Sequence, residues 1–171
     1  MNTPKPPSQP GCEWIEECLE MCTSPSVHVE DEGVRATFDN PRKRTIRKIH
    51  YDGCYFKGPG RQADFIVGLH GAIDVIIELK RSDTNIKEAA TQIEDTLERW
   101  KLDRKSEKAI AALIIYGRIE GKKKLPGRAP RAAAVILGLR AEFLKTHNRL
   151  LLIHENGSRH FTFNDFLRKQ I

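Results

Sequence analysis

Two apolar runs on either side of a glycine form the clearest pattern in the chain, Phe65–Leu69 and Ile73–Leu79. Their length and polar boundaries predict two buried strands joined by a turn at Gly71. In a hairpin centred on Gly71, Asp64 lies directly opposite Glu78, with Cβ atoms about 4.5–5.5 Å apart. Lys80 follows Glu78 by two residues, so it points to the same face of the sheet. The pattern therefore gathers two acids and an amine at the edge of a buried hairpin.

Helical and strand periods alternate through the rest of the chain. The helices expected from apolar residues at helical spacing are Cys12–Thr23, about Asp83–Lys105, and a buried helix at Ala132–Thr146. The strands expected are Val27–Glu30 with Val34–Phe38, a strand reaching Tyr51 and resuming at Cys54–Phe56, Ala109–Tyr116, and a hairpin of Leu150–Ile153 with His160–Phe163 before a last helical turn. This order predicts an α/β fold with a mixed central β-sheet flanked by helices.

The length of 171 residues predicts a single domain with a sizeable core. We expect it to span residues 12–171, after a disordered proline-rich tail at residues 1–11. No apolar run approaches the roughly 20 residues that cross a membrane, and the N-terminus lacks the apolar region of a secretory signal. A cytoplasmic protein without membrane contact is the expectation.

Four cysteines are present, Cys12, Cys18, Cys22 and Cys54. In a reducing cytoplasm, buried free thiols are the expected state. Cys18 and Cys22 are one helical turn apart, so a zinc or iron–sulfur site stays open as an alternative, although the spacing matches no CxxC pattern.

Basic residues exceed acidic ones, and the formal net charge of +6 suits a polyanionic partner. Three groups of basic side chains are candidates for contact with nucleic-acid phosphates. They are the cluster Arg42, Lys43, Arg44, Arg47 and Lys48, the pair Arg61 and Arg81 that flanks the acidic hairpin, and Lys123 and Arg128 in a basic loop. Aromatic residues are few, which gives little indication of a base-stacking platform.

Burying the charged groups of the acidic hairpin in a sheet costs free energy, because they lose their contacts with water. This cost indicates that the charged side chains have a chemical function. Two facing carboxylates suit a shared divalent cation, and a nearby ammonium can stabilise charge that develops on a phosphate. Asp74 lies on the same face of the strand as Glu78 and is an alternative ligand. However, it lies about 13 Å from Glu78 along the strand and is expected near the turn.

Asp64, thirteen intervening residues and then Glu78-Leu79-Lys80 resemble the motif of the PD-(D/E)xK nuclease superfamily, which includes restriction endonucleases and Holliday-junction resolvases. The likeness covers about residues 57–105, and Ala63 stands where the nominal proline would be. It implies a restriction-endonuclease-like core in which Asp64 and Glu78 hold Mg²⁺, for which Mn²⁺ substitutes, and Lys80 helps to activate water. It also implies a polar helix residue at the site, here Gln92, and in some members a glutamate from the first helix, for which Glu17 is the candidate.

The leading hypothesis is a metal-dependent endonuclease that hydrolyses phosphodiester bonds in duplex or branched DNA. Cutting two strands with one small active site usually needs two copies, so a homodimer is expected. The alternative is a non-catalytic protein that binds nucleic acid or another partner and keeps the nuclease fold.

Overall fold

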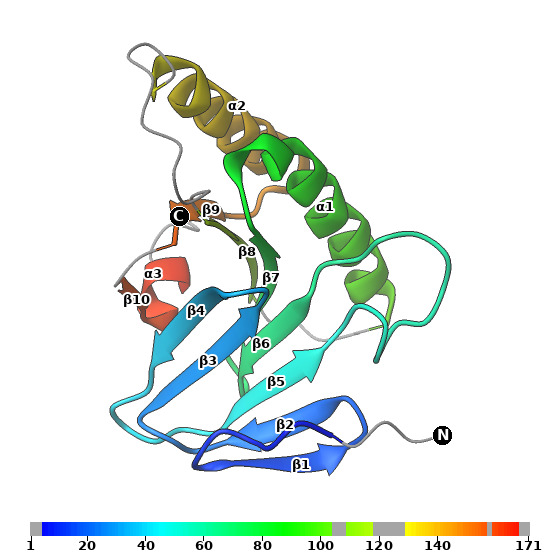
Figure 1. Ribbon diagram of the computed structural model, residues 1–171, viewed down its shortest axis with the longest axis vertical. Coiled ribbons are helices and arrows are strands. Elements are labelled where there is room, and N and C mark those ends of the chain that lie inside the picture. Colours follow the sequence, from blue (N-terminus) through cyan, green and yellow to red (C-terminus); the bar gives the residue numbers. More distant parts are fainter. Residues whose placement is uncertain (1–4, 104–108, 118–128, 157–158, 168–171) are drawn as a thin grey trace.

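The computed structural model describes residues 5–103, 109–117, 129–156 and 159–167 of the chain (Figure 1). Its main sheet has seven strands in the order β1-β2-β5-β6-β7-β8-β9. The strand bounds are β1 Cys12–Glu16, β2 Leu19–Cys22, β5 Ile46–His50, β6 Phe65–Leu69, β7 Ile73–Lys80, β8 Ala109–Tyr116 and β9 Leu151–Glu155. Pairing is antiparallel from β1 to β7 and parallel from β7 to β9, so the sheet is mixed.

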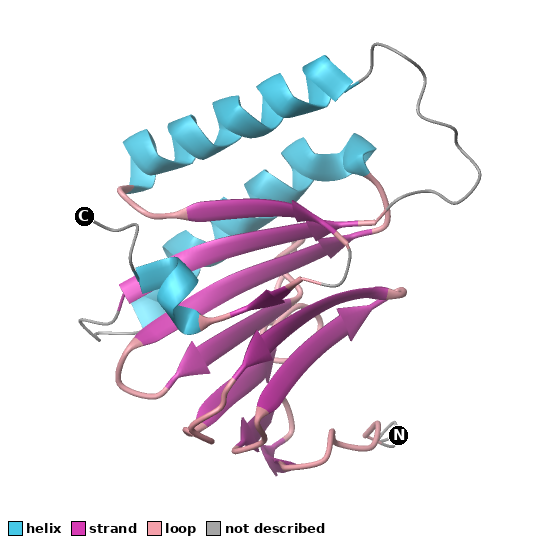
Figure 2. Cartoon of the chain, turned by 90° about the vertical axis from the view of Figure 1, so that its left-hand side faces the viewer, coloured by secondary structure: helices cyan, strands magenta, loops and turns pink. Residues whose placement is uncertain are grey.

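Different layers cover the two faces of this sheet (Figure 2). On one face, the crossover helices α1 (Ile86–Asp103) and α2 (Ala129–His147) pack over the even-numbered apolar residues of β6 to β8. A short 3-10 turn, η1 (Asp83–Asn85), precedes α1. On the other face lie β3 (Ser26–Asp31), β4 (Val34–Asp39) and β10 (His160–Phe161), which form a small sheet, together with α3 (Phe163–Leu167). The central strands β6 and β7 are thus buried on both sides, which matches their almost continuous apolar sequences.

Several predicted elements are confirmed. The α/β class, the β3–β4 hairpin, the strand Ala109–Tyr116 and the long helix after Lys80 all occur near their predicted bounds. The β6–β7 register pairs Phe65 with Ile77, as a hairpin centred on Gly71 predicts. Gly71 adopts a φ of +76°, a conformation that side chains with a Cβ rarely take.

Four predicted elements are wrong. The chain does not resume as a strand at Cys54–Phe56, where it forms a turn with an isolated bridge between Asp52 and Phe56. Residues 12–22 form the β1–β2 hairpin rather than a helix, since pairing of β2 with β5 overrides the helical spacing of the apolar residues. The expected C-terminal hairpin does not form, because β9 pairs with β8 and β10 pairs with β4 in the other sheet. The second helix is not buried: Leu137 and Leu144 of α2 are 63% and 51% exposed.

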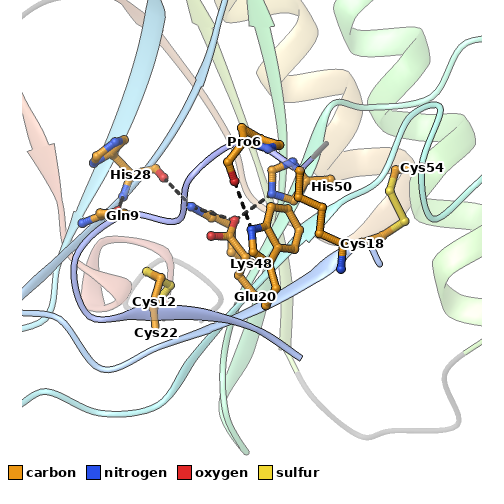
Figure 3. Close-up of polar contacts among 12 residues, drawn as sticks. Pro6, Gln9, Cys12, Cys18, Glu20, Cys22, His28, Lys48, His50 and Cys54 are labelled. Carbon is orange, nitrogen blue, oxygen red and sulfur yellow. Dashed lines mark hydrogen bonds and ion pairs between the residues drawn. A yellow bond between two sulfur atoms is a disulfide. The ribbon is translucent and has the colours of Figure 1, made fainter. Parts of the chain in front are cut away.

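All four cysteines form disulfides, Cys12–Cys22 and Cys18–Cys54. The prediction of free thiols, which followed from the expectation of a reducing cytoplasm, is therefore wrong. Cys12–Cys22 joins β1 to β2, and Cys18–Cys54 joins the β1–β2 turn to the loop after β5 (Figure 3).

The segment from Lys5 to Gly11 was expected to belong to a disordered tail, and the structure places it against β1 and β3. Gln9 Nε2 donates to the carbonyl of Ser26 (2.6 Å), and Trp14 Nε1 donates to the carbonyl of Pro6 (3.2 Å). Among the described helices, none is long and apolar enough to cross a membrane.

Candidate active site

The β6–β7 hairpin holds two carboxylates face to face. One residue beyond the paired strand, the Asp64 N–H donates to Glu78 Oε2 (3.1 Å). In return, the Leu79 N–H donates to Asp64 Oδ2 (2.8 Å). Each acid is thus fixed by the backbone of the opposite strand. The side chain of Glu78 is only 1% exposed, whereas Asp64 is half-buried.

Lys80 and Gln92 complete this cluster. The Lys80 ammonium lies 2.7 Å from Glu78 Oε1 and donates to Gln92 Oε1 (2.6 Å). Gln92 is on α1, which crosses over the strand ends, and it is buried. The structure therefore brings together four residues of the sequence-predicted site, Asp64, Glu78, Lys80 and Gln92.

Two further buried side chains tie α1 to the strand that carries Asp64. The hydroxyl of Thr96 accepts a hydrogen bond from the Ala63 N–H (2.8 Å) and donates to Gln62 Oε1 (3.2 Å). Gln92 Nε2 contacts the Gln62 carbonyl (3.4 Å). A proline at position 63 has no N–H to donate, so Ala63 permits a contact that the nominal proline of the motif would forbid. Sequence analysis missed Gln62 and Thr96, although both are polar residues beside an apolar pattern.

Burial changes the acidity of both carboxyl groups. It raises the pKa of Asp64 to about 6, against the opposing effect of the Leu79 N–H. Burial and the nearby Asp64 raise the pKa of Glu78 to about 8, although Lys80 opposes this. Both shifts mean that burial favours the neutral form of each carboxyl group, and a cation bound between them would favour the charged forms instead.

The two carboxylates suit Mg²⁺ better than they suit a metal ion whose ligands all come from protein side chains. Mg²⁺ usually takes one or two carboxylates and completes its shell with water and phosphate oxygens. Asp64 and Glu78 supply that number, and among the described residues no group of three or more His, Cys, Asp or Glu side chains could hold a metal ion. Glu17 lies in the exposed β1–β2 turn, 3.8 Å from Lys57, and the helix that was expected to carry it does not form.

Asp74, the alternative ligand, has a structural partner instead. Its carboxylate lies 3.0 Å from Arg47 Nη2 and accepts from Trp100 Nε1 (3.1 Å). Gly68 of β6 lies between Arg47 of β5 and Asp74 of β7, and a Cβ at Gly68 would collide with Asp74 Oδ1. Arg47 is thus held in a nearly buried ion pair, and with 12% of its side chain exposed, little of it is accessible to a nucleic acid.

Lys48 is likewise turned inward (Figure 3). Its ammonium lies 3.0 Å from Glu20 Oε2, which also contacts His50 Nε2 at 2.8 Å. Contacts with His50 and Lys48 lower the pKa of Glu20, although its burial acts in the opposite direction. Lys48 is only 6% exposed, so little of its side chain is accessible to a phosphate. Its position in a basic run misleads because strand alternation turns it toward the core.

The remaining basic residues lie on different surfaces. Arg42, Lys43 and Arg44 are exposed beyond the Ile46–Leu69 end of the sheet, and Asp64 lies beyond the other end of β6, about 17 Å along the strand. Arg42 and Arg44 line a surface cavity of about 350 Å³ floored by Leu69 and Phe163. One and the same phosphate cannot contact this cluster and the acidic pair, although a duplex is wide enough to span both.

Arg61 and Arg81, which flank the hairpin in the sequence, are both 73% exposed. Arg61 forms an ion pair with Glu88 of α1, and Arg81 lies 3.6 Å from Glu32 in the β3–β4 turn. Lys123 and Arg128 lie outside the described residues. Comparison with protein-family models, with curated proteins and with solved structures finds no match to this chain.

Proposed function

We propose that this protein is a Mg²⁺-dependent endonuclease of the PD-(D/E)xK type, with a restriction-endonuclease-like core formed by β5 to β8 and α1. The observation that carries the proposal is the convergence of Asp64, Glu78, Lys80 and Gln92. The Lys80 ammonium contacts both Glu78 and Gln92, so one amine is fixed beside the acidic pair.

Each residue has a defined task in this proposal. Asp64 and Glu78 are the side chains that would hold the cation. When bound, Mg²⁺ neutralises phosphate charge and lowers the pKa of a coordinated water. Lys80 offers an N–H to the attacking water or to a phosphate oxygen on which charge develops. Gln92 limits the directions in which the Lys80 side chain can point, because its amide oxygen accepts from the ammonium.

DNA is the proposed substrate, and the exposed Arg42, Lys43, Arg44, Arg61 and Arg81 are the described residues proposed to contact it. A homodimer is proposed because two strands require two active sites. Sedimentation of the purified chain with and without duplex DNA tests this assembly directly.

Incubation with supercoiled plasmid in Mg²⁺ or Mn²⁺ tests the activity. Glu78→Gln preserves the size of the side chain and removes its charge, and Glu142→Gln makes the same change at an exposed position on α2. We expect nicked or linear product from the wild type and from Glu142→Gln, and a loss of at least 100-fold in Glu78→Gln. Cleavage that survives in Glu78→Gln would contradict the proposed site. Metal-independent binding to DNA without cleavage of plasmid, branched or single-stranded substrates would instead favour the non-catalytic binding protein.

A further inference from the structure

Four aromatic side chains gather around the loop that follows β5. Tyr51 stacks with Tyr55 at a centroid distance of 5.5 Å and with Phe56 at 6.1 Å, with interplanar angles of 22° and 10°. Trp100 of α1 meets Tyr51 and Tyr55 edge-on, each at 5.9 Å. Four of the twelve aromatic residues of the chain thus gather around this loop, and another four, Phe38, Phe161, Phe163 and Phe166, pack together in the core on the other face of the sheet.

The aromatic loop, residues 51–56, is held in place by one disulfide and by backbone hydrogen bonds. The Tyr55 N–H donates to the His50 carbonyl (3.0 Å), and the Phe56 N–H donates to the Tyr51 carbonyl (2.9 Å). Cys54, beside Tyr55, is joined by its disulfide to Cys18. A ligand that stacks on this loop therefore meets a ring that is already positioned, so binding orders few additional side chains.

Tyr55 is the exposed member of this group. It is 48% exposed, whereas Tyr51 and Trp100 are fully buried behind it. The guanidinium of the exposed Arg99 lies 4.0 Å from the centroid of the Phe56 ring, and Lys57 follows with 66% of its side chain exposed. Arg99 therefore covers the ring next in sequence to Tyr55, and Lys57, whose ammonium lies 3.8 Å from Glu17, follows two residues after Tyr55. An exposed ring with cations on neighbouring residues presents the two features that recognise a nucleotide: a stacking surface for the base and positive charge for its phosphates.

The aromatic loop adjoins the acidic pair. The Tyr51 N–H donates to the Asp64 carbonyl (2.9 Å), and Tyr51 packs on the sheet face that α1 covers. The exposed ring of Tyr55 is therefore only two contacts away from Asp64, through the ring and backbone of Tyr51.

We propose that Tyr55 stacks an unpaired base of the nucleic acid, while Arg99 and Lys57 neutralise the phosphates beside it. In a continuous duplex the bases are stacked on one another, so a base that reaches Tyr55 comes from a single strand, a flap or the branch of a junction. The position of the scissile phosphate near Asp64 rests on the proposed function, whereas the stacking itself does not. The substrate class is nucleic acid with unpaired nucleotides.

Fluorescence anisotropy without divalent metal tests the stacking separately from cleavage. A labelled single-stranded oligonucleotide is compared with the duplex of the same sequence, for the wild type, Tyr55→Ala, Tyr55→Phe and the control Leu144→Ala, which truncates an exposed apolar side chain on α2. We expect Tyr55→Ala to lose about 5- to 150-fold in single-strand affinity, as is typical for one stacked base, and less than twofold in duplex affinity. Tyr55→Phe, which keeps the ring, is expected to stay within about twofold of the wild type.

The outcomes separate the two proposals. Single-strand binding that depends on Tyr55, without cleavage of any substrate, supports the stacking site and overturns the nuclease. Cleavage that depends on Glu78 but is equal in Tyr55→Ala and wild type, on single-stranded and flap substrates alike, overturns the stacking site and keeps the nuclease. Equal losses of single-strand and duplex affinity in Tyr55→Ala, or no measurable binding, would also overturn the stacking site.

Discussion

Removal of the two disulfides one at a time should destabilise the protein unequally. Cys12–Cys22 has a sequence separation of 10, and Cys18–Cys54 has one of 36. A cross-link restricts the unfolded chain, and this entropic effect grows with the length of the closed loop. The loop-closure relation gives about 2.7 kcal/mol for the shorter loop and about 3.8 kcal/mol for the longer one. The difference, about 1.1 kcal/mol, is independent of the constant in that relation.

The assay is urea unfolding of Cys12→Ala/Cys22→Ala and Cys18→Ala/Cys54→Ala in the absence of reductant, with the wild type measured in both oxidised and reduced states. The reduced wild type controls for the lost side-chain volume, because it keeps all four sulfur atoms. We expect Cys18→Ala/Cys54→Ala to be less stable than Cys12→Ala/Cys22→Ala by about 1 kcal/mol, and the free energies of unfolding of both variants to depend similarly on urea concentration. The reverse order of stability would refute the loop-length reasoning. Four thiols that react in the freshly purified, denatured protein would also refute it and would restore the expectation of free thiols.

Three other predictions concern the acidic pair, the contact that supports it and the basic residues. In the metal-free protein, we expect the free energy of unfolding to fall as pH rises from about 4.5 to about 8, because folded Glu78 and Asp64 keep protons that the unfolded chain releases. Glu78→Gln should make the free energy of unfolding depend less on pH. An equally steep pH dependence in that variant would contradict the role of Glu78. Thr96→Val should cost about 1–3 kcal/mol by leaving the Ala63 N–H without its acceptor, whereas Thr96→Ser, which keeps the hydroxyl, should cost clearly less in the same unfolding experiment. Arg47→Met should destabilise the fold by about 3–5 kcal/mol, because it leaves Asp74 as an uncompensated buried charge, but it should not change the salt dependence of DNA binding. Arg44→Gln should leave the stability of the fold unchanged and reduce the salt dependence of DNA binding. A changed salt dependence in Arg47→Met would show that Arg47 reaches the DNA.

The central hairpin was predictable because two signals agree there. The apolar runs require burial on both faces, and Gly71 fixes the turn, so the register that sets Asp64 opposite Glu78 follows from local sequence. The helix that carries Gln92 was predictable for a similar reason, since its apolar residues recur at helical spacing over five turns.

The N-terminal hairpin was not predictable in the same way. Apolar residues in the segment from Cys12 to Cys22 fit a helical period, but the hairpin is held by pairing with β5 and by the disulfide from Cys18 to Cys54, and both partners lie outside this segment. Local spacing carries no information on such partners. Arg47 and Lys48 show the same effect at the level of single side chains, because their burial depends on Asp74 and Glu20 in other strands.

The candidate site residues lie close together along the chain as well as in space. From Asp64 to Gln92 the chain passes once through β6, β7 and the first half of α1, without using the strands at either edge of the sheet. Contacts over such short sequence separations close quickly during folding, whereas β8 and β9 must wait for long crossovers. The four side chains can therefore come together in the earliest hairpin-and-helix unit, and the edges of the sheet are free to diverge among variants of this chain without rebuilding the site.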